Sequence, residues 1–144
     1  MSRITLTIPH DLPFSTTIPV RIGDVNYGGH LGNDAVLSIV HEARMRFLAS
    51  MGYSEHDIEG QAIIMSDAAI VYRGEAHYGD VLEIAVGAGD FSGSGCDLLY
   101  RLTRQADGKE IALCKTGIVF FDYMKRKPQR VPERFRERLV KGSD

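Results

Sequence analysis

The chain has 144 residues, of which 44% are hydrophobic and 25% are charged, and its formal net charge at pH 7 is −2. This length and composition predict a single globular domain over residues 1–144, and the small net charge gives no general attraction to nucleic acids or anionic membranes. Because no apolar run approaches about 18 residues and the N-terminus lacks the apolar stretch of a signal peptide, we expect a cytoplasmic protein without a membrane segment.

The first half of the chain predicts two short strands and one long helix. Residues 3–8 and 16–22 alternate between apolar and polar side chains, as half-buried strands do. Residues 34–51 carry apolar side chains three and four positions apart, which predicts a helix with Asn33 or Asp34 as its N-cap and Gly52 just beyond its end. The apolar surface of this helix is broad, so we expect other elements to wrap around it. Residues 54–60 predict one short helical turn.

The second half predicts an antiparallel sheet. Residues 62–72, 80–88, 96–105 and 110–123 are rich in strand-forming residues, and Asp107-Gly108 is a hairpin signal. A short C-terminal helix follows Pro132, with Phe135 and Leu139 four positions apart. Cys96 and Cys114 lie in strand-like segments and are expected to be free thiols.

Together these elements predict an α+β fold, in which an antiparallel sheet of five or six strands wraps around one long central helix. Such a sheet has edges to protect, and pairing of edges between two copies would cover them. We therefore expect a homodimer, with a homotetramer as the alternative.

The loop that precedes the long helix concentrates reactive groups. Residues 23–34 contain two carboxylates, two amides, one imidazole and four glycines. A Gly-rich loop that leads into a helix can direct backbone N–H groups and acid/base side chains at one small volume. We place the candidate site here.

The same loop resembles the hotdog-fold thioesterases of the 4-hydroxybenzoyl-CoA thioesterase-like group. That group often reads Asp-x-Asp-x-x-Gly-His-Val-Asn-Asn before a helix that carries Glu-Ala-Arg. Here the frame runs from Asp24 to Asn33, and the helix carries Glu42-Ala43-Arg44. A second segment, from Tyr78 to Ile84, resembles the family's Tyr-Gly-Asp-x-Leu-Glu-Val. The resemblance covers about residues 15–124 and implies a hotdog fold that hydrolyses an acyl-CoA thioester to a free acid and coenzyme A, without a cofactor.

One position of the motif departs from the family. Asn26 stands where the family has its usual catalytic carboxylate, and an amide cannot act as a base at neutral pH. Asn26 can still hold a water molecule, and Asp24 lies on the same side of an extended segment, which makes it the candidate base. The alternative for Asp24 is a loop-stabilising Asx-turn.

Two further side chains are candidates for the reaction. Glu42 carries the helix part of the motif and is a candidate for the active-site cleft, or else it forms a surface ion pair with Arg46. His30 is a candidate to orient water or to donate to the leaving sulfur, or else it stabilises the loop.

The resemblance also implies where the substrate binds. It places the thioester carbonyl at the start of the helix, near Gly29, Asn33 and Asp34, unless the last two simply cap the helix. Asp34 stands where the family often has a small apolar residue. Asp67 is a charge within an apolar strand, which either reaches the partner subunit's site in a dimer or points to solvent.

Two other polar groups have weaker claims to function. The basic residues 125–127 and Arg130 either meet coenzyme A phosphates or form a solvated tail. The five histidines show no metal-ligand spacing, so we predict no metal site.

Two other functions remain open on this fold. Enoyl-CoA hydratases and dehydratases resemble Gly-Asp-x-Asn-Pro-Leu-His, whereas this loop is one residue longer before His30 and lacks the proline. A non-catalytic acyl-CoA-binding protein is the other alternative, and Asn26 is the reason to consider it.

Overall fold

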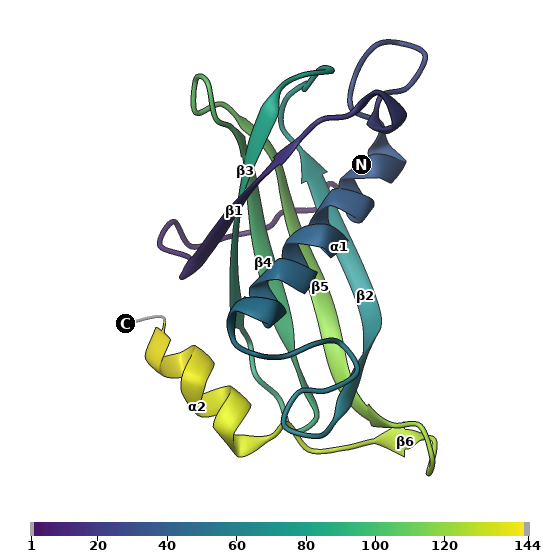
Figure 1. Cartoon of the computed structure of the whole chain (residues 1–144), viewed down its shortest axis with the longest axis vertical. Coiled ribbons are helices and arrows are strands. Elements are labelled where there is room, and N and C mark those ends of the chain that lie inside the picture. The colour runs from purple at the N-terminus through teal and green to yellow at the C-terminus, as the bar shows by residue number, and fades with distance from the viewer. Residues whose placement is uncertain (1, 143–144) are drawn as a thin grey trace.

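The computed structural model describes residues 2–142 and contains one long helix packed against an antiparallel sheet (Figure 1). The elements in chain order are β1 (Phe14–Pro19), the 3-10 helix η1 (Ile22–Asp24), α1 (Asn33–Ser50), β2 (Ala62–Tyr72), β3 (Val81–Gly89), β4 (Gly95–Arg104), β5 (Glu110–Asp122), β6 (Lys127–Pro128) and α2 (Glu133–Gly142). This is the predicted α+β architecture, and the four long strands fall within two residues of their predicted bounds. Among the described residues, neither α1 nor α2 is long and apolar enough to cross a membrane.

The strands follow the order β1-β3-β4-β5-β2 across the sheet, and every neighbouring pair is antiparallel. The two-residue strand β6 adds only to the end of β5. The segments β3, β4 and β5 are joined consecutively, as the predicted meander requires, and Gly108 adopts the positive φ of 71° that the hairpin turn needs. β1 and β2 are therefore the two edges of the sheet within one chain.

The predicted strand over residues 3–8 does not form. This segment instead crosses the face of the sheet opposite to α1, where the Arg101 guanidinium donates to the carbonyl oxygens of Ile8 at 2.6 Å and Pro9 at 2.7 Å. These carbonyls are satisfied by a side chain rather than by a strand neighbour, and Pro9 has no N–H to offer a ladder. Of the alternating apolar residues, Ile8 is buried and Leu6 is half-buried, while Ile4 is 62% exposed.

Helix α1 buries one face against the sheet. Its buried residues form pairs one helical turn apart: Ala35, Val36, Ile39, Val40, Ala43, Arg44, Phe47 and Leu48. The sheet covers this face of the helix, while on the opposite side Leu37 is 44% exposed and Met45 is 40% exposed in the single chain. Gly52 lies just beyond the helix with φ 82°, as predicted.

Residues 54–60 also differ from the prediction, because they form two tight turns rather than a helical turn. Glu59 and Gly60 both have positive φ, 52° and 88°, which a right-handed helix excludes. The carboxylate of Asp57 accepts the N–H of Gly60 at 2.9 Å and holds the second turn. The predicted C-terminal helix is present as α2, and its Phe135 packs against Phe120 with ring centroids 5.3 Å apart.

Candidate active site

The loop before α1 is built around the side chain of Asn26. Its Oδ1 accepts the backbone N–H of Gly28 at 2.9 Å and of His30 at 3.3 Å. Gly29 follows with φ 84°, a conformation that favours glycine, and its N–H donates to the Asn26 carbonyl at 3.0 Å. The Asx-turn considered for Asp24 is thus made by Asn26. The N–H of Gly29, a residue expected to bind substrate, has a partner within the loop.

Asp24 is buried beside the start of α1. Its side chain accepts the backbone N–H of Arg21 at 2.8 Å and faces the Arg21 guanidinium at 3.4 Å, which closes the 3-10 helix η1. The Asp24 carbonyl oxygen in turn accepts the N–H of Gly32 at 2.9 Å. The residue is only 6% exposed, and it lines a pocket of about 270 Å³ between β1 and α1.

Glu42 lines the same pocket at a point further along the helix. Its carboxylate accepts from Arg46 at 3.0 Å, and Arg46 also donates to the Thr17 carbonyl at 2.9 Å. Because an α-helix rises about 1.5 Å per residue, Glu42 lies about 13 Å along the axis from Asn33. The structure therefore brings Asp24 and Glu42 to one pocket, but only Asp24 lies beside the first turn of the helix.

The N-terminus of α1 presents two backbone N–H groups without a partner. Gly32 is the N-cap, with extended backbone at φ −71° and ψ 150°, and it has no side chain to accept from the helix. The prediction of Asn33 or Asp34 as N-cap is therefore wrong, because the helix begins at Asn33 itself. Among the described residues, no acceptor meets the N–H of Asn33 or Asp34, whereas that of Ala35 donates to the Gly32 carbonyl at 3.1 Å. Free N–H groups at the positive end of a helix dipole suit a carbonyl oxygen that gains negative charge.

A second pocket, of about 440 Å³, lies on the other side of the helix, between α1 and the edge strand β2. Its apolar lining is made by Leu37, Met65 and Ala68. Asp67 also lines it, but its carboxylate accepts the N–H of Gly117 at 3.0 Å and faces Lys115 at 3.4 Å. Because β2 bulges between Met65 and Asp67, this carboxylate satisfies a β5 N–H at the irregular point of the ladder.

A polar network beneath α1 was not anticipated from the sequence. Arg44 is 6% exposed, and it donates to Glu55 at 2.8 Å and to the Tyr100 hydroxyl at 3.3 Å. His41 contacts the other Glu55 oxygen at 2.9 Å, and Tyr100 shares a hydrogen bond of 2.8 Å with Thr116. The signal was available as a charged residue inside the apolar stripe of the helix.

Charge and burial set the protonation states in this network. Burial alone would lower the pKa of Arg44, but Tyr100 and Glu55 outweigh it and raise that pKa above its usual value. Burial opposes ionisation of Glu55 as well, yet hydrogen bonds and charge from Arg44 and His41 lower its pKa. The network therefore holds an ionised pair of the buried Arg44 and the half-buried Glu55, and Arg44 also links α1 to the sheet through Tyr100.

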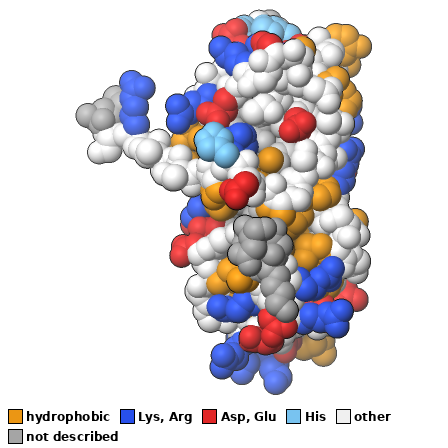
Figure 2. Space-filling model, turned by 90° about the vertical axis from the view of Figure 1, so that its left-hand side faces the viewer, with side chains coloured by type: hydrophobic (Ala, Val, Ile, Leu, Met, Phe, Trp, Pro, Cys, Tyr) orange, Lys and Arg blue, Asp and Glu red, His pale blue; other side chains and the backbone are white. Residues whose placement is uncertain are grey.

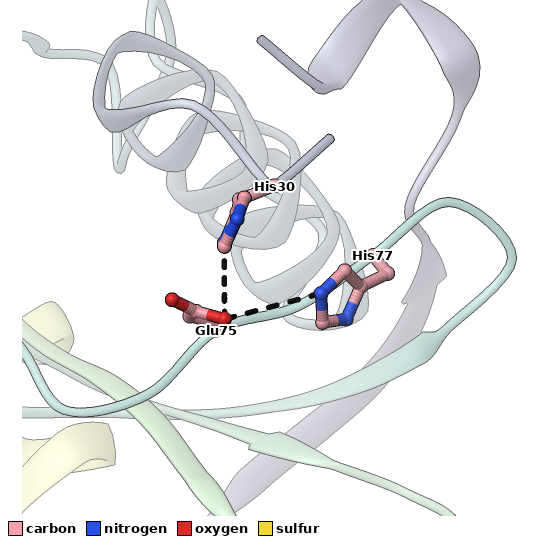
Figure 3. A group of neighbouring side chains, drawn as sticks. All are labelled: His30, Glu75 and His77. Carbon is pink, nitrogen blue, oxygen red and sulfur yellow. Dashed lines mark ion pairs between the residues drawn. The ribbon is translucent and has the colours of Figure 1, made fainter. Parts of the chain in front are cut away.

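His30 faces a different group of side chains. Its Nδ1 lies 3.1 Å from Glu75 Oε2, and the same oxygen is 4.0 Å from Nε2 of His77 (Figure 3). The two imidazole rings lie 5.3 Å apart between centroids. His30 does not line the pocket of Asp24 and Glu42. Spacing along the sequence missed this group because its members come from two distant loops.

The remaining candidate groups from the sequence are the two cysteines and the basic cluster. Burial raises the pKa of both the Cys96 and Cys114 thiols to about 12, so the predicted free cysteines are buried and protonated at neutral pH. The basic residues 125–127 adjoin β6, at the end of the sheet opposite to the start of α1 (Figure 1). Figure 2, which keeps the same vertical axis, shows Lys and Arg side chains gathered at that lower end. Within one chain this cluster therefore lies at the end of the sheet away from the α1 N-terminus.

Comparisons with known proteins agree on the type of protein. Residues 20–139 match the thioesterase-like superfamily. Among solved structures, the chain is similar to a 1,4-dihydroxy-2-naphthoyl-CoA thioesterase from Synechocystis, with 22% identity, a TM-score of 0.80, and coverage of 88% of this chain and 95% of that one. It is also similar to a thioesterase from Thermus thermophilus complexed with coenzyme A and Zn, with 22% identity, a TM-score of 0.80, and coverage of 94% and 98%. A probable thioesterase from Escherichia coli has 23% identity and a TM-score of 0.74, with coverage of 90% and 98%. None of the curated proteins matches the chain.

Proposed function

This chain belongs to the thioesterase-like superfamily, and from that premise we propose that it hydrolyses acyl-CoA thioesters to a free acid and coenzyme A. The observation that carries the proposal is the start of α1, where the unpartnered N–H groups of Asn33 and Asp34 lie beside the buried carboxylate residue Asp24. The named substrate of the Synechocystis enzyme and the coenzyme A complex of the Thermus enzyme support a coenzyme A thioester as the substrate class.

The proposed reaction uses the two parts of this site separately. The thioester carbonyl oxygen accepts from the Asn33 and Asp34 N–H groups, which stabilise the negative charge of the tetrahedral intermediate. Asp24 takes a proton from a water molecule in its pocket, and the water oxygen attacks the carbonyl carbon. The carbon–sulfur bond then breaks, the thiolate leaves without strong acid assistance, and it takes up the proton that Asp24 accepted, which restores the Asp24 carboxylate. A general base contributes about 10²–10⁴-fold to such a reaction.

The other predicted site residues take supporting roles in this proposal. Asn26 shapes the loop through its hydrogen bonds to Gly28 and His30. Glu42 is too far along α1 to reach a carbonyl at Asn33, so it orders the distal wall of the pocket through Arg46. His30 faces Glu75, and we assign it no proton-transfer step.

The acyl group fits the groove between α1 and β2. That groove combines a volume of about 440 Å³ with the apolar side chains of Leu37, Met65 and Ala68. Burial of an acyl chain there gains about 25 cal/mol per Å² of apolar surface. The polar residues Ser38 and Thr116 also line the groove and offer hydroxyl groups to an oxygenated acyl substituent.

The same groove supports a homodimer. β2 is an edge strand of 11 residues, and Met65, Tyr72 and the nearby Leu37 expose 40%, 50% and 44% of their surfaces. Long exposed apolar edges are normally covered, and pairing of two β2 strands about a two-fold axis would cover both at once. Asp67 would then lie at the interface. Sedimentation velocity of the wild-type protein tests this, with a dimer expected and a monomer contradicting it.

The hydrolytic activity is tested by incubation with a panel of aromatic and aliphatic acyl-CoA thioesters. Release of free coenzyme A, followed with a thiol reagent, is expected for at least one of them and is expected to fall strongly in Asp24→Asn. Hydration of an enoyl-CoA without thiol release would instead identify a hydratase. Saturable acyl-CoA binding without either reaction would identify a binding protein and overturn the proposal.

A further inference from the structure

The group formed by His30, Glu75 and His77 lies outside the pocket assigned to the reaction. His30 belongs to the loop before α1, whereas Glu75 and His77 belong to the connection between β2 and β3. Figure 3 shows both imidazoles directed at the carboxylate of Glu75. Among the described residues, the Glu75 carboxylate has no ion-pair partner other than these two histidines.

The backbone holds the two segments together independently of these side chains. His30 and His77 form an isolated antiparallel bridge, and the N–H of Leu31 donates to the carbonyl oxygen of Ala76 at 2.8 Å. The Glu75 carbonyl oxygen accepts from the Arg104 guanidinium at 2.8 Å. The three side chains therefore start from fixed backbone positions and converge without the need for a loop to close.

The donor atoms are spaced nearly as metal ligands are. With bonds of about 2.0–2.1 Å, tetrahedral zinc holds its ligand atoms about 3.3 Å apart. The separation from His30 Nδ1 to Glu75 Oε2 is 3.1 Å, that from His77 Nε2 to the same oxygen is 4.0 Å, and one donor atom from each residue lies within 4.8 Å of the others. All three side chains are partly or fully exposed, so small side-chain rotations can close the remaining gap.

A further carboxylate orients one of the imidazoles. The Asp80 carboxylate accepts the backbone N–H of His77 at 2.9 Å and lies 3.9 Å from its Nδ1. A carboxylate behind one ring nitrogen favours the proton on that nitrogen and leaves the other lone pair for a metal. In His77 the free nitrogen is then Nε2, which faces Glu75.

We propose that His30, Glu75 and His77 form a binding site for one divalent transition-metal ion, with zinc as the best fit. Two neutral imidazoles and one carboxylate suit zinc and leave a coordination position for water. The bound ion would join the loop before α1 to the β2–β3 connection and so stiffen the segment that precedes the free N–H groups of the helix. This site is separate from the Asp24 pocket, and the inference does not depend on thioester hydrolysis.

The test is metal binding by untagged, chelator-treated full-length protein. Titration with Zn²⁺ in a calorimeter is expected to show one saturable site per chain, and Zn²⁺ is expected to raise the melting temperature in a concentration-dependent manner. Glu75→Gln and His77→Gln are each expected to weaken binding by about 10–100-fold or more. The matched control is His56→Gln, at an exposed histidine outside the group, which is expected to bind as the wild type does.

The controls separate loss of ligands from loss of fold. Glu75 and His77 are exposed, so both variants should melt at the wild-type temperature when no metal is present. Substitution of Co²⁺ for Zn²⁺ should give the visible absorption of a low-symmetry site with nitrogen and oxygen ligands. A thiolate-to-cobalt band would assign the metal to a cysteine and overturn the proposal. Absence of saturable binding, or equal binding by both variants and the wild type, would overturn it as well.

Discussion

Gly32 donates its backbone N–H to the backbone carbonyl of Asp24 at 2.9 Å, and this bond joins the two halves of the proposed catalytic site. Asp24 ends the 3-10 helix η1, while Gly32 is the N-cap of α1. This hydrogen bond closes the loop between Asp24 and Gly32. The outer residues of the loop can therefore vary without a shift of the Asp24 carboxylate relative to α1. The relationship also explains why Asn26, at the outer part of the loop, is exposed while Asp24 is buried.

The two carboxylates of the pocket are expected to differ in their effect on turnover. Asp24→Asn should lower kcat by about 10²–10⁴-fold, because it removes the proposed base and keeps the side-chain shape. Glu42→Gln should change kcat by less than about tenfold, because Glu42 lies about 13 Å along the helix from Asn33. Steady-state kinetics with the best acyl-CoA substrate measures both. A larger loss in Glu42→Gln than in Asp24→Asn would transfer the role of base to Glu42.

At Gly32, a substitution that stabilises the protein is expected to lower its activity, because it would occupy a free N–H group of α1. A serine at the N-cap accepts the N–H of the second or third helical residue, so Gly32→Ser should gain a few tenths of a kcal/mol. The same hydroxyl would occupy an N–H proposed to bind the oxyanion, and loss of one such donor costs up to about 10²–10³-fold in kcat. Gly32→Ala is the matched control, because it adds the Cβ without an acceptor. Its Cβ would press on the flexible Asp34 side chain, so equal loss of activity in both variants would point to crowding instead.

Regular patterns in the sequence were sufficient for most of the fold. The period of α1, the glycines that separate the strands and the Asp107-Gly108 turn are local signals, and the structure confirms each of them. The prediction of a strand over residues 3–8 was wrong because apolar alternation does not show whether a neighbouring strand is available for pairing. Its carbonyls were instead satisfied by Arg101, a residue far along the chain.

The site was harder to predict because the same residue pattern allows several hydrogen-bond partners, some local and some beyond the element that carries the residue. The motif placed Glu42 on the helix, where the structure has it, but the expected extended segment with Asp24 and Asn26 on one side is wrong, because Asp24 ends the 3-10 helix η1 and is buried while Asn26 is exposed. Asn26 turns to its own loop, and Glu42 turns to Arg46. The partner of Arg44, Glu55, lies beyond the end of the helix, so spacing within the helix could not identify it.

Substitutions at Asn26 are expected to change the stability of the loop without supplying a catalytic base. Asn26→Ala removes the acceptor of two backbone N–H groups and is expected to destabilise the protein by about 1–2 kcal/mol. Asn26→Asp keeps that acceptor, and thermal melting should show little change. Because the new carboxylate would face Gly28 and His30, the double variant Asp24→Asn/Asn26→Asp should remain as inactive as Asp24→Asn. Recovery of turnover in the double variant would show that position 26 can supply the base.

The Arg44–Glu55 pair is expected to contribute to the free energy of unfolding in a way that is lost at acidic pH. Arg44 and His41 lower the pKa of Glu55 below its ordinary value of 4.5, so the unfolded chain takes up this proton at a higher pH than the folded chain. The contribution is therefore complete above the ordinary pKa and is lost as the pH falls from about 5 through the lower folded pKa. Glu55→Gln should cost about 1.5–3 kcal/mol at pH 7, and the deficit relative to wild type should shrink toward about pH 3. Urea unfolding across this range measures it, with Glu42→Gln as a control, because the exposed Glu42–Arg46 pair should contribute only about 0.3–0.5 kcal/mol. A deficit in Glu55→Gln that stays constant from pH 7 to pH 3 would mean that the pair contributes packing rather than charge.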